Sequence, residues 1–476
     1  MSLGHYDARR SGSPLSLWLV LGGLGLALGL GLALFLAVPR LTSVSPADTA
    51  QSVSSRAPLR LSFNRAMDHA AVEAALTLTP ALPGRFDWEA NTLVFTPAQP
   101  WPLGDTVTVS LAGGRSQRGL PLLGGRTWSF SVGRRRLAYL AGAPTANLWV
   151  LPVDEGGPAQ PVTNEPLGLY DYGVSPDGLT LAYAARREDG GADLRVVELS
   201  AAETHDLVLC PSEACLSPVY APNGRWLAYQ RHSLVPGLPG GELILGPSQI
   251  YLHSLTDPAA ADQPIGDQGG RFPRWGPDSR LSYLDTTRAA IAVHDLASGA
   301  VTYVPNASGE IGTWTPDASA IVFAELVFPE HVHDPNETEA EHAAATTAFY
   351  SYLVRVVVAT NEAANLSGDN RVDDGSPMFA PSGAWLAFGR KTLLDGQWTP
   401  GRQLWLMRPD GSEAYALTDD PLYNHSAFRW SPDSKTLAYM RFNVADPALP
   451  SEIWIVDMSD SQPARLVAGY LPEWLP

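Results

Sequence analysis

Two kinds of hydrophobic pattern divide the chain. Residues 15–38 form an apolar run with a single Ser and no charged side chain, whereas later residues alternate apolar and polar positions in short segments. Alternation with a period of two is typical of β-strands that bury one face. We therefore expect an all-β protein preceded by one hydrophobic helix.

The apolar run is long enough to cross a membrane. Its 24 positions would reach about 36 Å as a helix, more than the ~30 Å of a hydrocarbon core. Arg9 and Arg10 precede the run and Arg40 follows it, which favours a cytoplasmic N-terminus. We expect a cytoplasmic segment (1–14), a transmembrane anchor (Leu15–Val38), and the bulk of a single-pass protein outside the bacterial cytoplasmic membrane. A cleaved secretory leader is the alternative, although its apolar stretch is usually only about 7–15 residues.

Short alternating segments between residues 42 and 133 predict a β-sandwich. They are LRLSF (59–63), ALTLT (75–79), TLVFT (92–96), TVTVSL (106–111) and TWSFSV (127–132). Two segments of this region resemble the bacterial Ig-like domain of surface and S-layer proteins. They are VSPADTAQSVSSRAPLRLSF and, after it, FDWEANTLVFTPAQPWPLGDTVTVSL. Because nothing in the segment assembles a nucleophile, a base or a ligand set, we expect a spacer.

One phrase recurs through the rest of the chain. Its copies are VSPDGLTLAYAA (174–185), YAPNGRWLAYQR (220–231), WGPDSRLSYLD (275–285), WTPDASAIVFAE (314–325), FAPSGAWLAFGR (379–390) and WSPDSKTLAYMR (430–441). Each copy predicts a strand, a tight turn in which Pro presets φ, and a second strand. Third and fourth strands follow, as in NLWVLPV and then QPVT. Four strands per repeat are typical of a propeller blade.

The two ends of the repeat region predict how the ring closes. RRRLAYLA (134–141) is a second strand with no first strand before it, and LPEWLP (471–476) matches the first-strand phrases. We expect the C-terminal strand to complete the first of seven blades in residues 134–476, which removes free sheet edges. The repeat resembles the TolB-like, or PD40 (WD40-like), β-propeller repeats. That resemblance implies a fold used for binding, scaffolding and hydrolysis alike.

Charge and composition exclude several partners. The chain has 49 acidic and 32 basic residues, which give a net charge of -17. Electrostatic binding to nucleic-acid phosphates is therefore not expected. Lys391 and Lys435 are its only lysines and neither follows Gly, which excludes a P-loop.

The longer loops indicate which face of the propeller binds a ligand. Loops between second and third strands are enlarged at 232–248, 326–350, 391–401 and 442–450, and they emerge on the same face as the junctions between blades. The candidate ligand-binding residues at this channel mouth are Asp171, Asp369, Asp373, Asp374, Asp419, Asp420, His425 and Trp398. An acidic rim would attract a cationic peptide, an amine or Ca²⁺. The alternative is that these Asp residues cap turns through their own backbone, with no cofactor bound.

Two further groups of residues have candidate chemistry. His331, His333, Asp334 and His342 crowd one loop, but their spacing matches no zinc pattern, so we predict no metal site and keep them as weak candidates. Cys210 and Cys215 are expected to form a disulfide. Their C-x₄-C spacing differs from the C-x-x-C of a redox-active pair.

These observations favour a binding or scaffold protein of the cell envelope that recognises a protein, peptide or glycan. The sequence contains no G-x-S-x-G or H-E-x-x-H motif. A propeller enzyme, a hydrolase or lyase acting on envelope polysaccharide or peptide, is one alternative. A purely structural envelope protein is the other.

Overall fold

The computed structural model describes residues 38–142, 144–237, 241, 243–328, 338, 349–368, 371–394 and 398–476. The predicted anchor Leu15–Val38 lies outside this part, except for Val38. Among the described residues, no helix combines the length and the apolar character that a membrane crossing requires. The expected location as a single-pass membrane protein, with its bulk outside the cytoplasm, is therefore corrected. An apolar run alone gives only the composition of a span, and a span also requires a continuous helix.

The chain divides into two compact units. Among the described residues, the first unit comprises 38–53, 58–98 and 106–131, and the second comprises 54–57, 99–105 and the described residues from 132 to 476.

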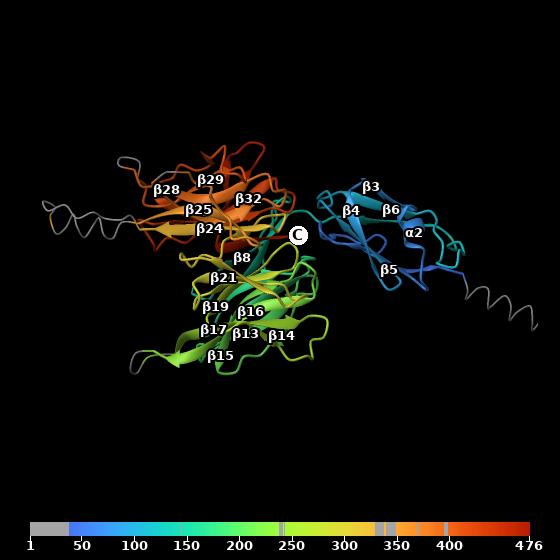
Figure 1. Ribbon diagram of the computed structural model, residues 1–476, viewed down its shortest axis with the longest axis horizontal. Coiled ribbons are helices and arrows are strands. Elements are labelled where there is room, and N and C mark those ends of the chain that lie inside the picture. The colour runs from blue at the N-terminus through green and yellow to red at the C-terminus, as the bar shows by residue number, and fades with distance from the viewer. Residues whose placement is uncertain are drawn as a thin grey trace, which may run out of the picture. The chain divides into compact units, whose positions relative to one another are not determined.

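The first unit consists of two antiparallel sheets and one short helix (Figure 1). In sheet order, the strands are β1 (Leu41–Ser45), β2 (Leu59–Phe63), β5 (Thr92–Pro97) and β4 (Gly84–Glu89) in one sheet, and β3 (Leu76–Thr79), β6 (Thr106–Leu111) and β7 (Arg126–Ser131) in the other. Leu59, Leu61 and Phe63 are buried on one face of β2 while Arg60 is exposed on the other, which confirms the predicted alternation. The helix α2 (His69–Glu73) begins after Asp68, whose carboxylate accepts a hydrogen bond from the Ala71 amide.

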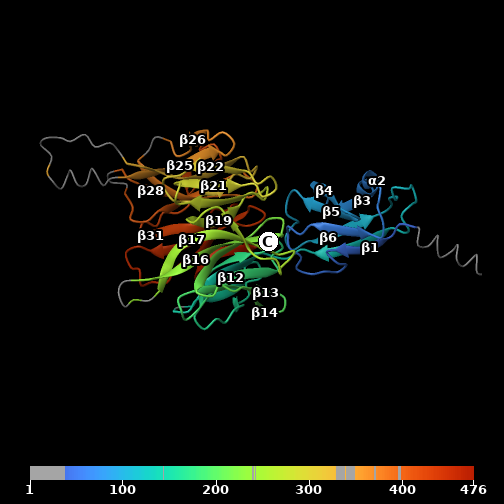
Figure 2. The same cartoon turned by 60° about the horizontal axis from the view of Figure 1, so that its bottom comes forward.

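The second unit consists, over the described residues, of seven four-stranded groups in which neighbouring strands are antiparallel. From first to fourth strand, sheet 1 consists of β35 (Tyr470–Leu475), β8 (Arg136–Ala141), β9 (Asn147–Pro152) and β10 (Gln160–Pro161). Sheet 2 consists of β11 (Leu169–Val174), β12 (Thr180–Arg186), β13 (Ala192–Glu198) and β14 (Glu203–Val208). Sheet 3 consists of β15 (Glu213–Tyr220), β16 (Trp226–Pro236), β17 (Leu243–Ser254) and β18 (Gln263–Ile265). Figure 2 shows the long strands β16 and β17 side by side.

Sheets 4 to 7 repeat this order. Sheet 4 consists of β19 (Gly270–Trp275), β20 (Leu281–Asp285), β21 (Ala290–His294) and β22 (Val301–Pro305), and sheet 5 of β23 (Thr313–Trp314), β24 (Ala320–Val327), β25 (Tyr350–Val357) and β26 (Ala363–Asn365). Sheet 6 consists of β27 (Val372–Phe379), β28 (Leu386–Thr392), β29 (Gln403–Met407) and β30 (Tyr415–Ala416). Sheet 7 consists of β31 (Tyr423–Trp430), β32 (Thr436–Asn443), β33 (Glu452–Asp457) and β34 (Pro463–Ala468). Single parallel bridges join sheet 2 to sheet 3 and sheet 5 to sheet 6.

The recurring Pro-Asp turn has a simple local cause. In sheet 2 the Ser175 hydroxyl donates a hydrogen bond to the Asp177 carboxylate at 2.6 Å, and the Leu179 amide donates to the same carboxylate at 3.0 Å. A side-chain turn of this kind holds the first and second strands in register. The equivalent Thr and Ser hydroxyls in sheets 5 and 7 make the same contact with Asp317 and Asp433.

Buried side chains join each sheet to the next. One cluster of buried residues spans sheets 1 and 2, and the others span 2 and 3, 3 and 4, 4 and 5, 5 and 6, and 6 and 7. A further cluster joins sheet 7 to sheet 1 through Ala438, Ile453, Leu137, Tyr139 and Trp474. The individual sheets stay open, and side-chain packing links the last sheet back to the first.

The C-terminal strand lies where the sequence predicted. β35 pairs with β8, with Trp474 opposite Leu137 and Tyr470 opposite Leu140. Trp474 is buried, and its indole nitrogen donates a hydrogen bond at 2.9 Å to the Arg429 carbonyl oxygen of β31 in sheet 7. The last strand therefore completes sheet 1 and ties it to sheet 7.

We predict that Trp474→Ala lowers the free energy of unfolding by about 3–5 kcal/mol, because it removes a buried indole from the contact between sheets 7 and 1. Urea unfolding of the full chain measures the change. Leu209→Ala, at an exposed position, is the control and should change stability by less than about 0.5 kcal/mol. Equal stability of Trp474→Ala and the parent chain would mean that this contact does not hold the ring together.

Candidate ligand-binding site

The loop-rich face of the second unit is defined by the connections between second and third strands and by the junctions between sheets. Neighbouring strands of a sheet run in opposite directions, so these two kinds of connection emerge on the same side. Among the described strands of the unit, β16 and β17 are the longest, with 11 and 12 residues, and they form one hairpin. In sheet 4, β20 and β21 have only 5 residues each.

Exposed apolar side chains gather on this face. Most of the exposed large apolar residues of the second unit lie at its loops or at the adjoining strand ends: Leu167, Leu209, Leu243, Ile244, Leu245, Phe272, Phe328, Phe349, Leu394, Trp398, Leu422, Phe442 and Leu449. Over the described residues, the exceptions are Leu179, Val301, Tyr303 and Tyr415. Apolar residues scattered singly over a surface carry little information, whereas contiguous ones are candidates for an interaction surface. Leu243, Ile244 and Leu245 are consecutive and exposed on β17.

A hollow of about 570 Å³ opens on the loop-rich face where sheets 3 and 4 meet. Its lining includes His232, Leu245 and Ser248 of sheet 3, together with Arg271 and Thr286 from sheet 4. Burial, together with the positive charge of Arg271, lowers the pKa of His232, although a contact with the Gly246 carbonyl oxygen opposes this. His232 is therefore neutral near pH 7, while the exposed Arg271 supplies the positive charge of the hollow.

The first strands carry a repeated backbone irregularity near the loop-rich face. Ser217, Phe272, Ser376, Ala427 and Leu471 each have a φ between 50° and 54° and lie five residues before the turn proline. The pairing of each of these strands with its second strand also shifts register there, which marks a β-bulge. Bulges aim backbone amides and side chains away from the ladder, toward neighbouring groups.

Asp171 is held by one of these bulges. Its carboxylate accepts hydrogen bonds from the Ser217 amide at 2.9 and 3.0 Å and from the Ser217 hydroxyl at 3.1 Å. The Gln230 side chain donates to the Ser217 hydroxyl and accepts a hydrogen bond from the Phe272 amide. This chain of contacts links sheets 2, 3 and 4. Burial raises the pKa of Asp171 to about 6, in spite of the hydrogen bonds from Ser217.

Asp374, by contrast, is fully buried and pairs with an arginine. Arg390 of β28 contacts both carboxylate oxygens, at 2.7 and 2.6 Å, and is itself only 8% exposed. Burial raises the pKa of Asp374, while the Arg390 guanidinium opposes that shift.

Asp373 and Glu310 lie around the arginine Arg402. Asp373 accepts hydrogen bonds from Arg402 at 2.6 Å and from the Ser351 hydroxyl at 2.8 Å. A Cβ atom on Gly375 would lie 2.9 Å from the Arg402 guanidinium and 3.1 Å from the Glu310 carboxylate, so glycine leaves the space that these groups occupy. Burial raises the pKa of Glu310, whose carboxylate accepts a hydrogen bond from the Ser376 amide.

The remaining junction residues have different surroundings. Asp420 pairs with Arg441 at 2.9 Å, and Asp419 is exposed. His425 is buried, with its Nδ1 atom 2.9 Å from the Arg402 carbonyl oxygen. Burial lowers the pKa of His425 to about 4, so the imidazole is neutral near pH 7.

Trp398 is 58% exposed, and the Lys391 ammonium lies 4.5 Å from its ring centre. Asp369, His331, His333, Asp334 and His342 lie outside the described residues. Within the part that the structure does describe, no group of His, Cys, Asp and Glu could hold a metal ion. Cys210 and Cys215 form a disulfide, with their Cα atoms 6.1 Å apart.

The structure therefore pairs three carboxylates of the predicted acidic rim with arginines. Arginines neutralise Asp373, Asp374 and Asp420, and Ser217 engages Asp171. The ligand role of these residues stays a prediction. Sequence reasoning missed Glu310, Arg390, Arg402 and Arg441. The signal that could have found the two arginines Arg390 and Arg441 is their common place at the end of a second strand.

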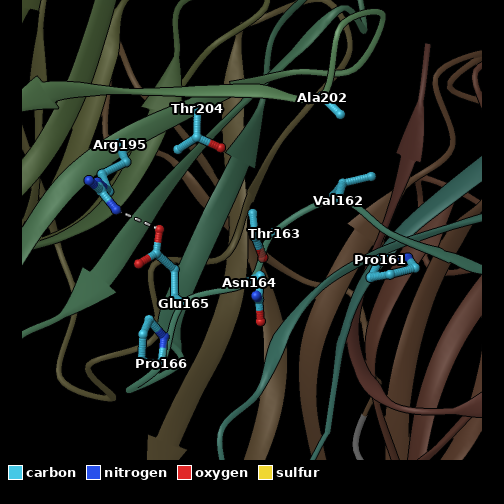
Figure 3. Close-up of a pocket in the computed structure, with 9 residues that line it drawn as sticks. All are labelled: Pro161, Val162, Thr163, Asn164, Glu165, Pro166, Arg195, Ala202 and Thr204. Carbon is cyan, nitrogen blue, oxygen red and sulfur yellow. Dashed lines mark hydrogen bonds and ion pairs between the residues drawn. The ribbon is translucent and has the colours of Figure 1, made fainter.

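A second hollow, of about 660 Å³, lies between the outer parts of sheets 1 and 2 (Figure 3). Glu165 and Arg195 face each other there at 2.8 Å, and Thr163, Asn164 and Thr204 complete its polar lining. Glu165 also accepts a hydrogen bond from the Tyr183 hydroxyl, and Arg195 also pairs with Asp206. These charges are satisfied within the protein, so the hollow on the loop-rich face is the better ligand candidate.

We predict that Asp171→Asn stabilises the fold increasingly as the pH rises. The native pKa of about 6 lies above the usual 3.9 of an unfolded Asp, so the native state binds more protons between pH 4 and 6. The carboxyl group therefore costs the native state stability as pH increases through that window, by about 3 kcal/mol in total. Urea unfolding from pH 4 to 7 should show the difference between variant and parent growing by that amount. Asp419→Asn, at an exposed position on the same face, should not reproduce the gain.

We also predict that Asp374→Asn lowers the free energy of unfolding by about 3–5 kcal/mol at pH 7, because it leaves Arg390 buried and unpaired. The double variant Asp374→Asn with Arg390→Met should recover most of this loss in urea unfolding. A loss confined to ligand binding, with stability unchanged, would show that Asp374 is a recognition residue instead.

Several known proteins are similar to parts of this chain. Residues 37–132 match the model of the bacterial Ig-like domain. An uncharacterized peptidase, YuxL of Bacillus subtilis (strain 168), is 25% identical over 194 residues, which cover 36% of this chain and 28% of that protein. The chain thus spans little more than a quarter of that relative's length.

Three solved structures are similar in fold. TolB from Acinetobacter baumannii has a TM-score of 0.40 at 14% identity, covering 84% of this chain and 83% of that one. The β-propeller domain of the Trilobed protease from Pyrococcus furiosus has a TM-score of 0.45 at 10% identity, covering 78% and 94%. A puromycin-hydrolyzing peptidase of Mycobacterium tuberculosis has a TM-score of 0.49 at 12% identity, covering 88% and 57%. At these identities the likeness concerns the fold alone. The chain combines a bacterial Ig-like domain at its N-terminus with structural similarity to TolB and other propeller proteins.

Proposed function

We propose that the protein is a binding protein in which a closed, seven-bladed propeller recognises a protein or a peptide through its loop-rich face. The observation that carries this proposal is the concentration of exposed apolar side chains on that face. Among them, Leu243, Ile244 and Leu245 are consecutive on the long hairpin of sheet 3. Aliphatic side chains gain stability by packing against apolar groups of a partner, which favours a protein or peptide over a glycan.

The electrostatics of this face support recognition rather than chemistry. Asp373, Asp374 and Asp420 are each held by an arginine. A surface whose side chains are fixed before the ligand arrives loses less conformational entropy on binding. The ring of packed sheets beneath it supplies the same preorganisation to the backbone.

An alternative function is a propeller enzyme that hydrolyses a peptide. Two observations favour it: the similarity to an uncharacterized peptidase over part of the chain, and the raised pKa values of Asp171 and Glu310. Burial raises the pKa of both carboxyl groups, and a carboxyl group with a raised pKa is a candidate for general acid catalysis. Turnover of fluorogenic peptide substrates by the full chain, lost in both Asp171→Asn and Glu310→Gln, would favour this alternative.

We predict that peptides selected against the full chain from a displayed random library bind the loop-rich face. The triple variant of Leu243, Ile244 and Leu245 to Ser should weaken such peptides by more than about 10-fold, because truncating an apolar anchor of an interface costs over 1 kcal/mol. Fluorescence anisotropy measures the affinity.

Val301→Ser combined with Tyr303→Ser is the matched control, since both residues are exposed on β22 away from the loop-rich face. The proposal fails if the control variant loses binding while the triple variant keeps it.

A further inference from the structure

The hollow between sheets 3 and 4 contains an arginine without a counter-charge. Its volume of about 570 Å³ is typical of ligand pockets, which measure roughly 300–1,000 Å³. Among the described residues that line the hollow, none has a carboxylate, and His232 is neutral near pH 7. Arg271 of β19 makes no ion pair with any residue that the structure describes. Its charge therefore gives the hollow a positive character.

The carboxylates that lie close to the lining residues in sequence have other partners. Asp267 and Asp285 both pair with Arg288, at 3.0 and 2.6 Å. Asp285 also accepts a hydrogen bond from the Thr287 hydroxyl at 2.6 Å. A carboxylate beside a guanidinium attracts a second cation less strongly, because the two opposite charges largely cancel. The charge of Arg271 is thus left for a ligand.

Most side-chain donors in the lining are used within the protein. The hydroxyls of Ser248 and Thr286 donate to backbone carbonyl oxygens at 2.7 and 2.9 Å, and the Nδ1 atom of His232 lies 3.1 Å from a third. A hydroxyl or a neutral imidazole has only one such hydrogen to donate. Gln268 is exposed, and its side chain makes no hydrogen bond with the described residues. The side-chain donors left for a ligand are therefore those of Arg271 and Gln268.

A β-bulge presents Arg271 to the hollow. Arg271 and Phe272 are consecutive yet both exposed, because the bulge at Phe272, with its φ of 53°, interrupts the alternation of β19. The Phe272 amide donates a hydrogen bond at 3.0 Å to the Gln230 side chain, which fixes the bulge to sheet 3. The Arg271 guanidinium lies 4.8 Å from the centre of the Phe272 ring. This cation–π contact holds the charge in place before a ligand arrives.

We propose that the hollow binds an Asp or Glu side chain of a peptide through Arg271, while aliphatic residues beside it in the peptide pack on Leu243, Ile244 and Leu245. Leu245 both lines the hollow and belongs to this exposed apolar segment, so one short peptide can make both contacts. A guanidinium binds a carboxylate through two parallel hydrogen bonds. The inference rests on the proposed function in taking a peptide as the ligand, and it specifies which residues that peptide must carry.

The charge of the whole chain makes this selection a local one. A net charge of -17 repels an acidic peptide from the surface as a whole. An acidic side chain therefore gains affinity only by direct contact with a positive group, and Arg271 supplies one beside the apolar segment. One carboxylate balances one guanidinium, whereas a phosphate dianion would leave a negative charge without a partner.

Peptides selected against the full chain from a displayed random library provide the probes. They should carry Asp or Glu beside aliphatic residues, and replacing that residue by Asn or Gln should weaken binding about 10-fold in fluorescence anisotropy, the lower end for hydrogen bonds to a charged group, since Arg271 is exposed. Arg271→Met should bind the acidic peptide and its amide form equally. Arg225→Met, which removes an exposed arginine at the turn between β15 and β16, is the matched control and should bind as the parent does.

A charge reversal tests the contact independently of any loss of stability. Arg271→Glu should bind the selected peptide with Lys in place of its acidic residue more tightly than the parent chain binds that Lys peptide. A residue with only a structural role would not produce this exchange of preference. If Arg271→Met does not fold, the Arg271→Glu variant and the Lys peptide decide the test.

Three results would each overturn the inference: selected peptides without an acidic residue, an equal cost of the amide replacement on Arg271→Met and on the parent, or an equal loss of affinity in Arg225→Met. If such peptides still lose affinity for the triple Ser variant of Leu243, Ile244 and Leu245, the proposed function stands without the acidic site. Failure to select any peptide for the loop-rich face would reject both.

Discussion

Hydrophobic packing between neighbouring sheets, including the contact of the last sheet with the first, is the constraint on which the rest of the propeller depends. Each sheet buries both faces against its neighbours, so small residues such as Ala138 and Ala438 sit beside large ones such as Tyr139 and Trp474. β35 pairs with β8, and buried side chains of sheet 7 pack against sheet 1, so the first and last sheets of the repeat region contact each other. This packing brings residues distant in sequence together, as the pairing of Trp474 with Leu137 shows.

That convergence explains the electrostatics of the channel mouth. Charged residues at the starts of first strands and at the ends of second strands are brought within contact distance, and the arrangement satisfies most of them in pairs. Asp373 meets Arg402 across 29 residues of sequence, and Asp420 meets Arg441 across 21.

Arginines lie among the junction carboxylates from which the acidic rim was predicted. These arginines balance much of the acidic charge, and apolar side chains dominate the exposed loops of the loop-rich face. Long-range attraction for a cation is weakened when each carboxylate has a positive partner a few ångströms away. Contact with apolar groups of a partner therefore becomes the main source of affinity in the proposed complex.

The sequence by itself determined the architecture of the second unit. The repeated Pro-Asp turn and the Leu-Ala-Tyr motif of the second strands predicted the four-stranded sheets. Residues 134–141 lack a first strand before them and residues 471–476 match a first strand, which predicted the pairing of β35 with β8. It also indicated the sandwich of the first unit and the Cys210–Cys215 disulfide. These features are local or periodic, so short stretches contain the information. Tertiary structure alone decided which charges are paired and which apolar side chains stay exposed. Those depend on distances between sheets, and a repeat pattern does not encode them.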